Sequence, residues 1–201
     1  MIAIIDYGMG NLASVKNAFL KLGYKTFISS KPDDILSADR VVLPGVGAFG
    51  DAINSLQDTG LDRTIYRIVK ESKPLLGVCL GLQLLFTESE ENGVHKGLDI
   101  IQGRVIKFKL PSFYKVPHMG WNEVKPDPGS QLFKNILPGS YFYFVHSYYV
   151  VPEDNSFAAA VSDYGLDFIC AVEKDNLFAT QFHPEKSGSI GLEVLKNFAE
   201  I

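Results

Sequence analysis

The chain has 201 residues, of which 46% are hydrophobic and 21% are charged, and its formal net charge is −4. This length and composition predict a single domain over residues 1–201 with a substantial core, and they exclude a disordered chain. The acidic balance argues against a nucleic-acid partner, and the lack of an apolar run of ~18 residues argues against a membrane-spanning helix.

The first apolar run, residues 2–5, has the composition of a strand buried in a parallel sheet. No basic segment precedes it, so we expect a strand here and not a secretory signal. The turn at residues 8–13 reads Gly-x-Gly-x-x-Ala, a loose match to the dinucleotide-binding fingerprint. Because no acidic residue ends the next strand, residues 24–28, we favour a tight turn into a helix over residues 12–22 and keep nucleotide binding as the minor alternative.

Residues 40–43 form a third predicted strand, which runs into a glycine-rich loop, Pro-Gly-Val-Gly, at residues 44–47. Ligand sites in such folds lie at the carboxyl ends of parallel strands. The backbone N–H groups of this loop, with that of Leu80, would supply the two donors that an oxyanion in acyl transfer needs. The alternative is a plain connection to the next helix, predicted over residues 51–72 with a break near Gly60.

The next segment has the pattern of a nucleophile elbow with cysteine in place of serine. A buried strand over residues 75–78 is followed by a buried helix over residues 80–86, and Cys79 lies at the junction between Gly77 and Gly81. The turn is sharp, so only small residues fit beside the nucleophile. The helix directs its free N–H groups and positive dipole end at the sulfur, and both favour the nucleophilic thiolate.

The two cysteines of the chain, Cys79 and Cys170, do not make a disulfide framework. Cys170 falls in the middle of a predicted strand with no helix after it, so we expect a core residue. A reducing cytosol suits this usage as well as a catalytic thiol. Taken alone, the elbow is also compatible with Cys79 as a buried structural residue.

The second half of the chain changes from helices to strands. A segment within it, residues 117–124, contains His118, which is either a ligand or base or a structural imidazole, and Trp121, which is either core or an interface anchor. We predict an α/β fold with a mixed, mostly parallel central sheet flanked by helices. Antiparallel strands are added to it in the second half, at residues 100–108, 140–150, 158–161 and 168–172.

The last strand, residues 177–183, ends in the sequence His183-Pro184-Glu185, before a helix over residues 189–201. In an extended segment, residues i and i+2 face the same side, and proline keeps the preceding residue extended. The histidine and the glutamate therefore present a base and a carboxylate that orients it. With Cys79, they predict an acyl-transfer enzyme with a Cys-His-Glu triad.

The chain resembles the class I glutamine amidotransferases. The glycine-rich loop, the elbow and the His-Pro-Glu segment follow one another in the order found in that family, and together they span nearly the whole chain. Three further segments narrow the resemblance to the family's glutaminase subunits of histidine biosynthesis, at residues 44–47, 117–122 and 143–147. The resemblance implies that Cys79 attacks the side-chain amide of glutamine to form a thioester. It also implies that His183 protonates the departing ammonia and that Glu185 orients His183.

Further residue roles follow from the resemblance alone. It implies an oxyanion hole at Gly47 and Leu80, and glutamine contacts from Gly45, Gln83, Glu91, His146 and Ser147. It implies a cytoplasmic heterodimer in which ammonia passes to a separate cyclase subunit with a (β/α)₈ barrel, docked at Trp121, Asn122, Tyr143 and Lys186. No cofactor or metal is implied, and the four histidines show no ligand spacing.

Three other functions remain as alternatives. A paralogous amidotransferase would feed another synthase, for instance one in amino-sugar synthesis. A cysteine peptidase or thioesterase would use the same elbow on another substrate. A non-enzymatic binding domain would keep Cys79 and His183 as core residues.

Overall fold

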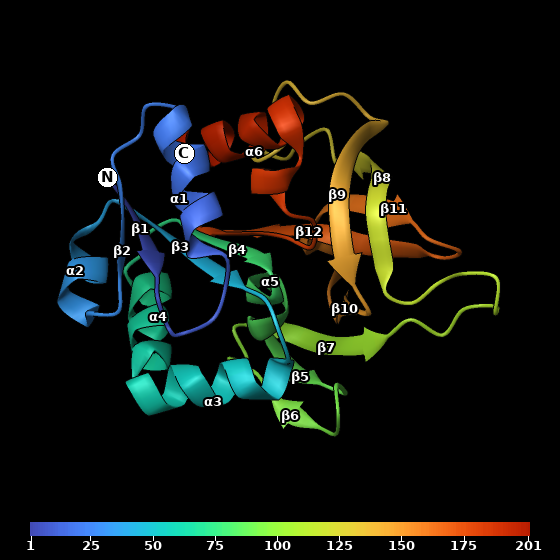
Figure 1. The fold of residues 1–201 in the computed structure, drawn as a ribbon, viewed down its shortest axis with the longest axis horizontal. Helices are drawn as coiled ribbons and strands as arrows, with labels where there is room; N and C mark the ends of the chain where they lie inside the picture. The colour runs from blue at the N-terminus through green and yellow to red at the C-terminus, as the bar shows by residue number, and fades with distance from the viewer.

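The first half of the chain alternates strands with helices, as its apolar runs predict. The computed structural model describes all residues 1–201 and is drawn in Figure 1. Its elements up to the elbow are β1 (Ile2–Ile5), α1 (Leu12–Lys21), β2 (Thr26–Ser29), α2 (Pro32–Ser37), β3 (Arg40–Gly45), α3 (Phe49–Thr59), α4 (Leu61–Lys70), β4 (Leu75–Cys79) and α5 (Leu80–Leu84). The break between α3 and α4 is at Gly60, whose φ of 70° places it in the left-handed region.

The second half consists mainly of strands and ends in a helix. Its elements are β5 (Phe86–Ser89), β6 (His95–Lys96), β7 (Ile101–Lys107), β8 (His118–Pro126), β9 (Ser140–His146), β10 (Tyr148–Pro152), β11 (Ala158–Asp163), β12 (Asp167–Lys174), β13 (Leu177–Thr180) and α6 (Gly188–Glu200). Short 3₁₀ turns lie at Asn155–Phe157 and Pro184–Lys186. None of the helices is both long and apolar enough to cross a bilayer.

All strands belong to one connected sheet. The order along its main path is β2-β1-β3-β4-β13-β12-β10-β7-β5-β6, and β11, β8 and β9 branch from β12. The first five strands of this order run parallel. From β12 onward most pairs are antiparallel. The predicted α/β class, with a largely parallel sheet and added antiparallel strands, is confirmed.

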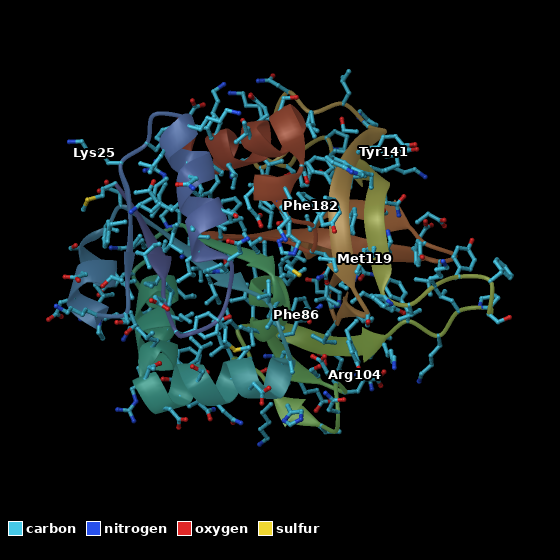
Figure 2. All side chains as sticks on the ribbon, in the orientation of Figure 1. Lys25, Phe86, Arg104, Met119, Tyr141 and Phe182 are labelled. Carbon is cyan, nitrogen blue, oxygen red and sulfur yellow. The ribbon has the colours of Figure 1, made fainter.

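The two faces of the sheet are covered by different helices (Figure 1). On one face, α1 and α6 pack over a cluster that includes Phe19, Phe178 and Phe198. On the other face, α3, α4 and α5 pack over a second cluster, which includes Phe49 and Leu56. Figure 2 shows buried Phe182 between α6 and β9, and Met119 and Tyr141 at the β8–β9 pair, where both side chains are exposed.

The register of the parallel strands gathers three chain segments at one edge. In the pairing of β3 with β4, Gly45 lies opposite Cys79, and in the pairing of β13 with β4, Thr180 lies opposite Val78. The loop after β3, the elbow after β4 and the segment after β13 therefore leave the sheet side by side. The site is built at this edge.

Several element boundaries differ from the sequence predictions. The helix after Cys79 ends at Leu84, and Phe86 begins β5 beside β7. Every residue from Leu80 to Phe86 is buried, so hydrophobic periodicity could not distinguish a helix from a strand. The predicted strand over residues 140–150 is two strands divided at Ser147, of which β9 pairs with β8, and β10 with β7 and β12. The short helix α2 was not predicted.

Candidate active site

Cys79 lies at a strained turn between β4 and α5. Its φ of 55° and ψ of −106° lie in a region that non-glycine residues rarely occupy. A Cβ on Gly77 would lie 2.8 Å from the carbonyl oxygen of Gly81, and a Cβ on Gly81 would lie far inside contact distance of the carbonyl oxygen of Leu43. The close backbone approach that the Gly-x-Cys-x-Gly pattern predicts is therefore present.

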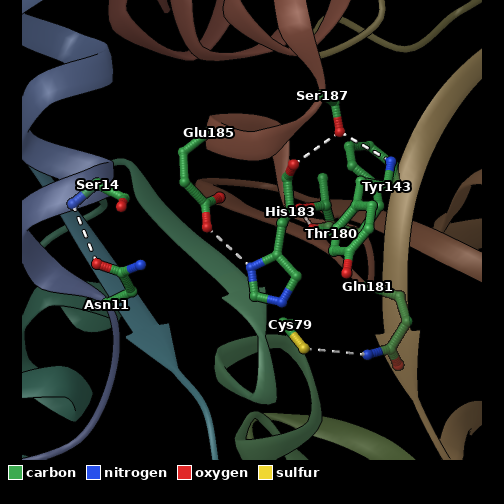
Figure 3. Close-up of polar contacts among 10 residues, drawn as sticks. Asn11, Ser14, Cys79, Tyr143, Thr180, Gln181, His183, Glu185 and Ser187 are labelled. Atoms are coloured by element: carbon green, nitrogen blue, oxygen red, sulfur yellow. Dashed lines mark hydrogen bonds and ion pairs between the residues drawn. The ribbon is translucent and has the colours of Figure 1, made fainter. Parts of the chain in front are cut away.

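His183 lies between Cys79 and Glu185 (Figure 3). Its Nδ1 is 2.9 Å from Glu185 Oε1, and both side chains are almost fully buried, with 3% and 2% exposed. Its Nε2 is buried without a hydrogen-bond partner and lies on the Cys79 side of the ring. The route to this arrangement differs from the predicted one, because β13 ends at Thr180 and Glu185 lies in a 3₁₀ turn and not in an extended strand.

The charge state of His183 follows from these neighbours. Burial alone would lower the pKa of His183, but Cys79 and then Glu185 favour the imidazolium and together raise the pKa to about 9. At neutral pH, His183 is therefore a proton donor at Nε2. A cysteine that gives its proton to this histidine becomes a thiolate, which is the nucleophilic form of cysteine.

The raised pKa of His183 predicts how stability depends on pH. A group whose pKa rises on folding contributes stability that is complete below its unfolded pKa of about 6.5 and is lost as the pH approaches its folded pKa. We expect the free energy of unfolding in urea to fall between pH 6.5 and pH 9 by up to about 3 kcal/mol. In Glu185→Gln, which lacks one source of the shift, the fall should be smaller. Equal slopes for the two proteins would contradict this origin of the shift.

Gln181 is a site residue that was not predicted from the sequence. Its Nε2 lies 3.8 Å from Cys79 Sγ and donates to it, and its Oε1 accepts a hydrogen bond of 3.1 Å from Gln83 Nε2. Gln83 Nε2 also donates to the carbonyl oxygen of Tyr148, at 3.0 Å. The sequence contains a signal for this residue. Gln181 precedes His183 by two residues, and residues at that spacing face the same side of the extended segment that the sequence predicts.

The backbone of His183 is held by β9. Its N–H donates to the carbonyl oxygen of Tyr143 at 2.9 Å. The Ser187 hydroxyl accepts from the Tyr143 N–H at 3.0 Å and donates to the His183 carbonyl oxygen at 2.7 Å. Ser187 was also missed, since its role depends on a contact between distant segments.

The glycine-rich loop lies beside the sulfur. Gly45 has no room for a side chain, because a Cβ would lie 2.7 Å from the Tyr7 hydroxyl and 2.8 Å from Leu80 Cβ. Gly47 has a φ of 105°, and its N–H donates no hydrogen bond within the protein. Leu80 is the first residue of α5, so its N–H has no partner within the helix. Both predicted oxyanion-hole donors are thus available.

A cavity of about 290 Å³ opens over Cys79 and His183. It contains four of the five residues predicted to hold the substrate, Gln83, Glu91, His146 and Ser147, and both predicted oxyanion-hole residues. Glu91 is fixed there by the Phe49 N–H, which donates to its Oε2 at 2.8 Å. The fifth predicted residue, Gly45, does not line the cavity. Four lining residues were not predicted, namely Val46, Pro117, Val145 and Tyr148.

Three of the four predicted interface residues cluster on the surface. Trp121 is 56% exposed and packs edge-on against Tyr143, with ring centroids 6.1 Å apart. Lys186 Nζ lies 5.8 Å from the centre of the Tyr143 ring. Asn122, on the opposite face of β8, points inward and donates to the carbonyl oxygen of Asp163 at 2.7 Å. Trp121 is therefore a surface residue and not part of the core.

Known proteins resemble the chain along its whole length. Residues 3–201 match the glutamine amidotransferase class-I family. The imidazole glycerol phosphate synthase subunit HisH of Syntrophotalea carbinolica is 52% identical, with all of both chains covered. The protein of the same name from Methanothermobacter thermautotrophicus is 54% identical, covering 100% of this chain and 98% of the relative.

A solved structure resembles the fold at lower identity. It is a glutamine amidotransferase from Thermotoga maritima, with a TM-score of 0.67 and 16% identity, covering 99% of this chain and 80% of the other. At this identity the likeness concerns the fold only. The sequence match over residues 3–201 and the relatives at about half identity are decisive: the chain belongs to the class-I glutamine amidotransferase family.

Proposed function

We propose that the chain is the glutaminase subunit of an imidazole glycerol phosphate synthase, with Cys79, His183 and Glu185 as its catalytic triad. The single observation that carries the proposal is the position of His183. One ring nitrogen binds buried Glu185 and the other lies on the Cys79 side of the ring, at the base of a cavity about 290 Å³ in volume. The full-length relatives at about half identity supply the name of the synthase.

The proposed reaction has two halves. The Cys79 sulfur attacks the side-chain carbonyl carbon of glutamine, and the negative charge that develops on the oxygen is stabilised by the N–H groups of Leu80 and Gly47. The carbon–nitrogen bond breaks as His183 Nε2 gives its proton to the leaving nitrogen, so ammonia departs and a glutamyl thioester remains. His183 Nε2 then takes a proton from water as the water oxygen attacks the thioester carbonyl carbon. The carbon–sulfur bond breaks, so the Cys79 sulfur leaves as a thiolate beside protonated His183, and glutamate departs with its carboxyl proton lost to solvent. Glu185 keeps His183 oriented throughout.

The cavity walls suggest how glutamine is selected. Glu91 and the polar groups of Gln83 and Ser147 line the cavity, and they suit the charged amino and carboxylate groups of an amino acid. His146 forms a neutral wall, because burial lowers its pKa to about 3, and both of its ring nitrogens are already hydrogen-bonded inside the protein. Ammonia would pass to a cyclase subunit docked over Trp121, Tyr143 and Lys186, in the cytoplasm.

The test is glutamate release from glutamine. It is measured with the chain alone, then with the cyclase subunit of a histidine-biosynthetic synthase, and then with that cyclase in the presence of its nucleotide substrate. We expect turnover with the liganded partner and growth of a histidine auxotroph that carries this gene. Turnover of peptides or thioesters without turnover of glutamine would overturn the proposal. Rescue of an amino-sugar auxotroph in place of a histidine auxotroph would assign the chain to a paralogous synthase.

A further inference from the structure

Two buried histidines join the outer strand pair to the cavity wall. Asn122 Nδ2 lies 3.3 Å from His118 Nε2, and His118 Nδ1 lies 3.1 Å from His146 Nε2. His146 Nδ1 lies 2.8 Å from the carbonyl oxygen of Tyr148. The sequence alone leaves the role of His118 open, and the proposed reaction does not use it.

The hydrogen-bond partners at the outer end fix every proton in this chain of contacts. The Asn122 amide has one orientation, because its Oδ1 accepts the N–H of Glu123 at 2.8 Å and its Nδ2 faces the carbonyl oxygen of Asp163. Nδ2 is therefore a donor, and His118 Nε2 must accept. His118 then carries its hydrogen on Nδ1 and donates it to His146 Nε2.

The inner end gives the same assignment independently. The carbonyl oxygen of Tyr148 can only accept, so His146 carries its hydrogen on Nδ1. Its Nε2 is then an acceptor, which matches the hydrogen on His118 Nδ1. Protonating either ring would set two N–H groups against each other. Burial likewise lowers the pKa of His118 to about 4 and that of His146 to about 3.

The contacts continue from the cavity wall to the sulfur. The Tyr148 carbonyl oxygen that accepts from His146 also accepts from Gln83 Nε2 at 3.0 Å. Gln83 binds Gln181, and Gln181 donates to Cys79 Sγ. The position of His146 thus affects the carbonyl group that holds Gln83 in the cavity.

We propose that His118 is a positioning residue for the glutamine cavity. Its Nδ1–H fixes the tautomer and the position of His146, and His146 in turn fixes the position of Gln83 through the Tyr148 carbonyl group. The inference rests on the proposed function. His118 touches neither the cavity nor the sulfur, since it is absent from the cavity lining and stacks between Phe144 and Tyr164, at centroid distances of 4.8 Å and 4.0 Å. A packing role and a donor role therefore require different substitutes.

The test compares two variants that separate these roles. His118→Asn places an amide N–H where Nδ1–H was but loses the stacked ring, whereas His118→Phe keeps a stacked ring and loses the donor. In complex with the liganded cyclase, we expect His118→Phe to raise KM for glutamine roughly five- to tenfold, with kcat within about twofold, because a buried acceptor on His146 loses its partner. We expect His118→Asn to keep KM within about twofold while it lowers Tm.

A second readout does not depend on activity. Nitrogen-15 spectra of the wild-type chain should show both His118 and His146 as neutral rings with hydrogen on Nδ1. Either histidine with hydrogen on Nε2 would overturn the proposal, even in a chain without glutaminase activity, so its failure is distinct from that of the proposed function. A wild-type KM in His118→Phe, or a raised KM in His118→Asn alone, would assign His118 to packing and also overturn the proposal.

Discussion

Replacing Cys79 with alanine will reduce glutamate release by roughly 10⁴-fold or more, because no other group can form the thioester. The side chain is small and lies at the start of α5, so the fold should survive the change. The measurement is turnover of glutamine by the variant in complex with the liganded cyclase, together with its melting temperature. Residual turnover within tenfold of wild type would remove Cys79 from the mechanism.

The matched control is the second cysteine of the chain. Cys170 is fully buried in the middle of β12, and burial raises the pKa of its thiol well above the usual value. Cys170→Ala should keep wild-type turnover and lose about 1 kcal/mol of stability, as expected for a small cavity. In the native protein, iodoacetamide should modify Cys79 and leave Cys170 unmodified. Loss of turnover in Cys170→Ala at unchanged stability would argue against this division of roles.

Replacing Gly81 with alanine should cost more than about 3 kcal/mol of stability and abolish turnover. The new Cβ would collide with the carbonyl oxygen of Leu43, an atom of the neighbouring strand β3. Backbone atoms cannot rotate away as a side chain can, so β3 and α5 must separate. The measurement is urea unfolding together with glutamate release.

Gly60→Ala provides the comparison for this variant. Gly60 has a φ of 70°, and a Cβ there would meet nothing within 4 Å. Its replacement should cost only about 1–2 kcal/mol, from backbone conformation alone, and should leave turnover unchanged. If the two variants proved equally stable, steric exclusion at the elbow would not be the reason for Gly81.

The parts of the site that the sequence predicts are those determined by neighbours in the chain. The elbow at Cys79 and the His183–Glu185 pair are short segments in which residue type and spacing carry the information. Gln181 was missed although its spacing from His183 was a signal, whereas Ser187 was missed because its partner, Tyr143, lies far away in sequence. Backbone groups such as the Tyr148 carbonyl leave no mark in a side-chain pattern.

The element boundaries show a similar limit. Alternation in residues 140–146 predicts which side chains are buried, because β9 has one face on the core. No alternation exists in the fully buried segment after Cys79, so the start of β5 could not be predicted there. Hydrophobic alternation therefore locates the ends of an element best where that element is half exposed.

The hydrogen bonds that join the main chain of Tyr143 to His183 and Ser187 limit how the surface around β9 can be redesigned. The Tyr141 side chain is exposed on the outer face of β9 and lies outside the proposed cyclase contacts, so new docking specificities can be built there. The main chain at Tyr143 is not free to change in this way, because its carbonyl oxygen and N–H are bonded to His183 and Ser187. A proline at this point would remove the N–H that donates to Ser187, and an inserted residue would shift the carbonyl oxygen that accepts from His183, so either change would displace the histidine. Libraries for new partners should therefore vary β9 only by substitution with residues other than proline.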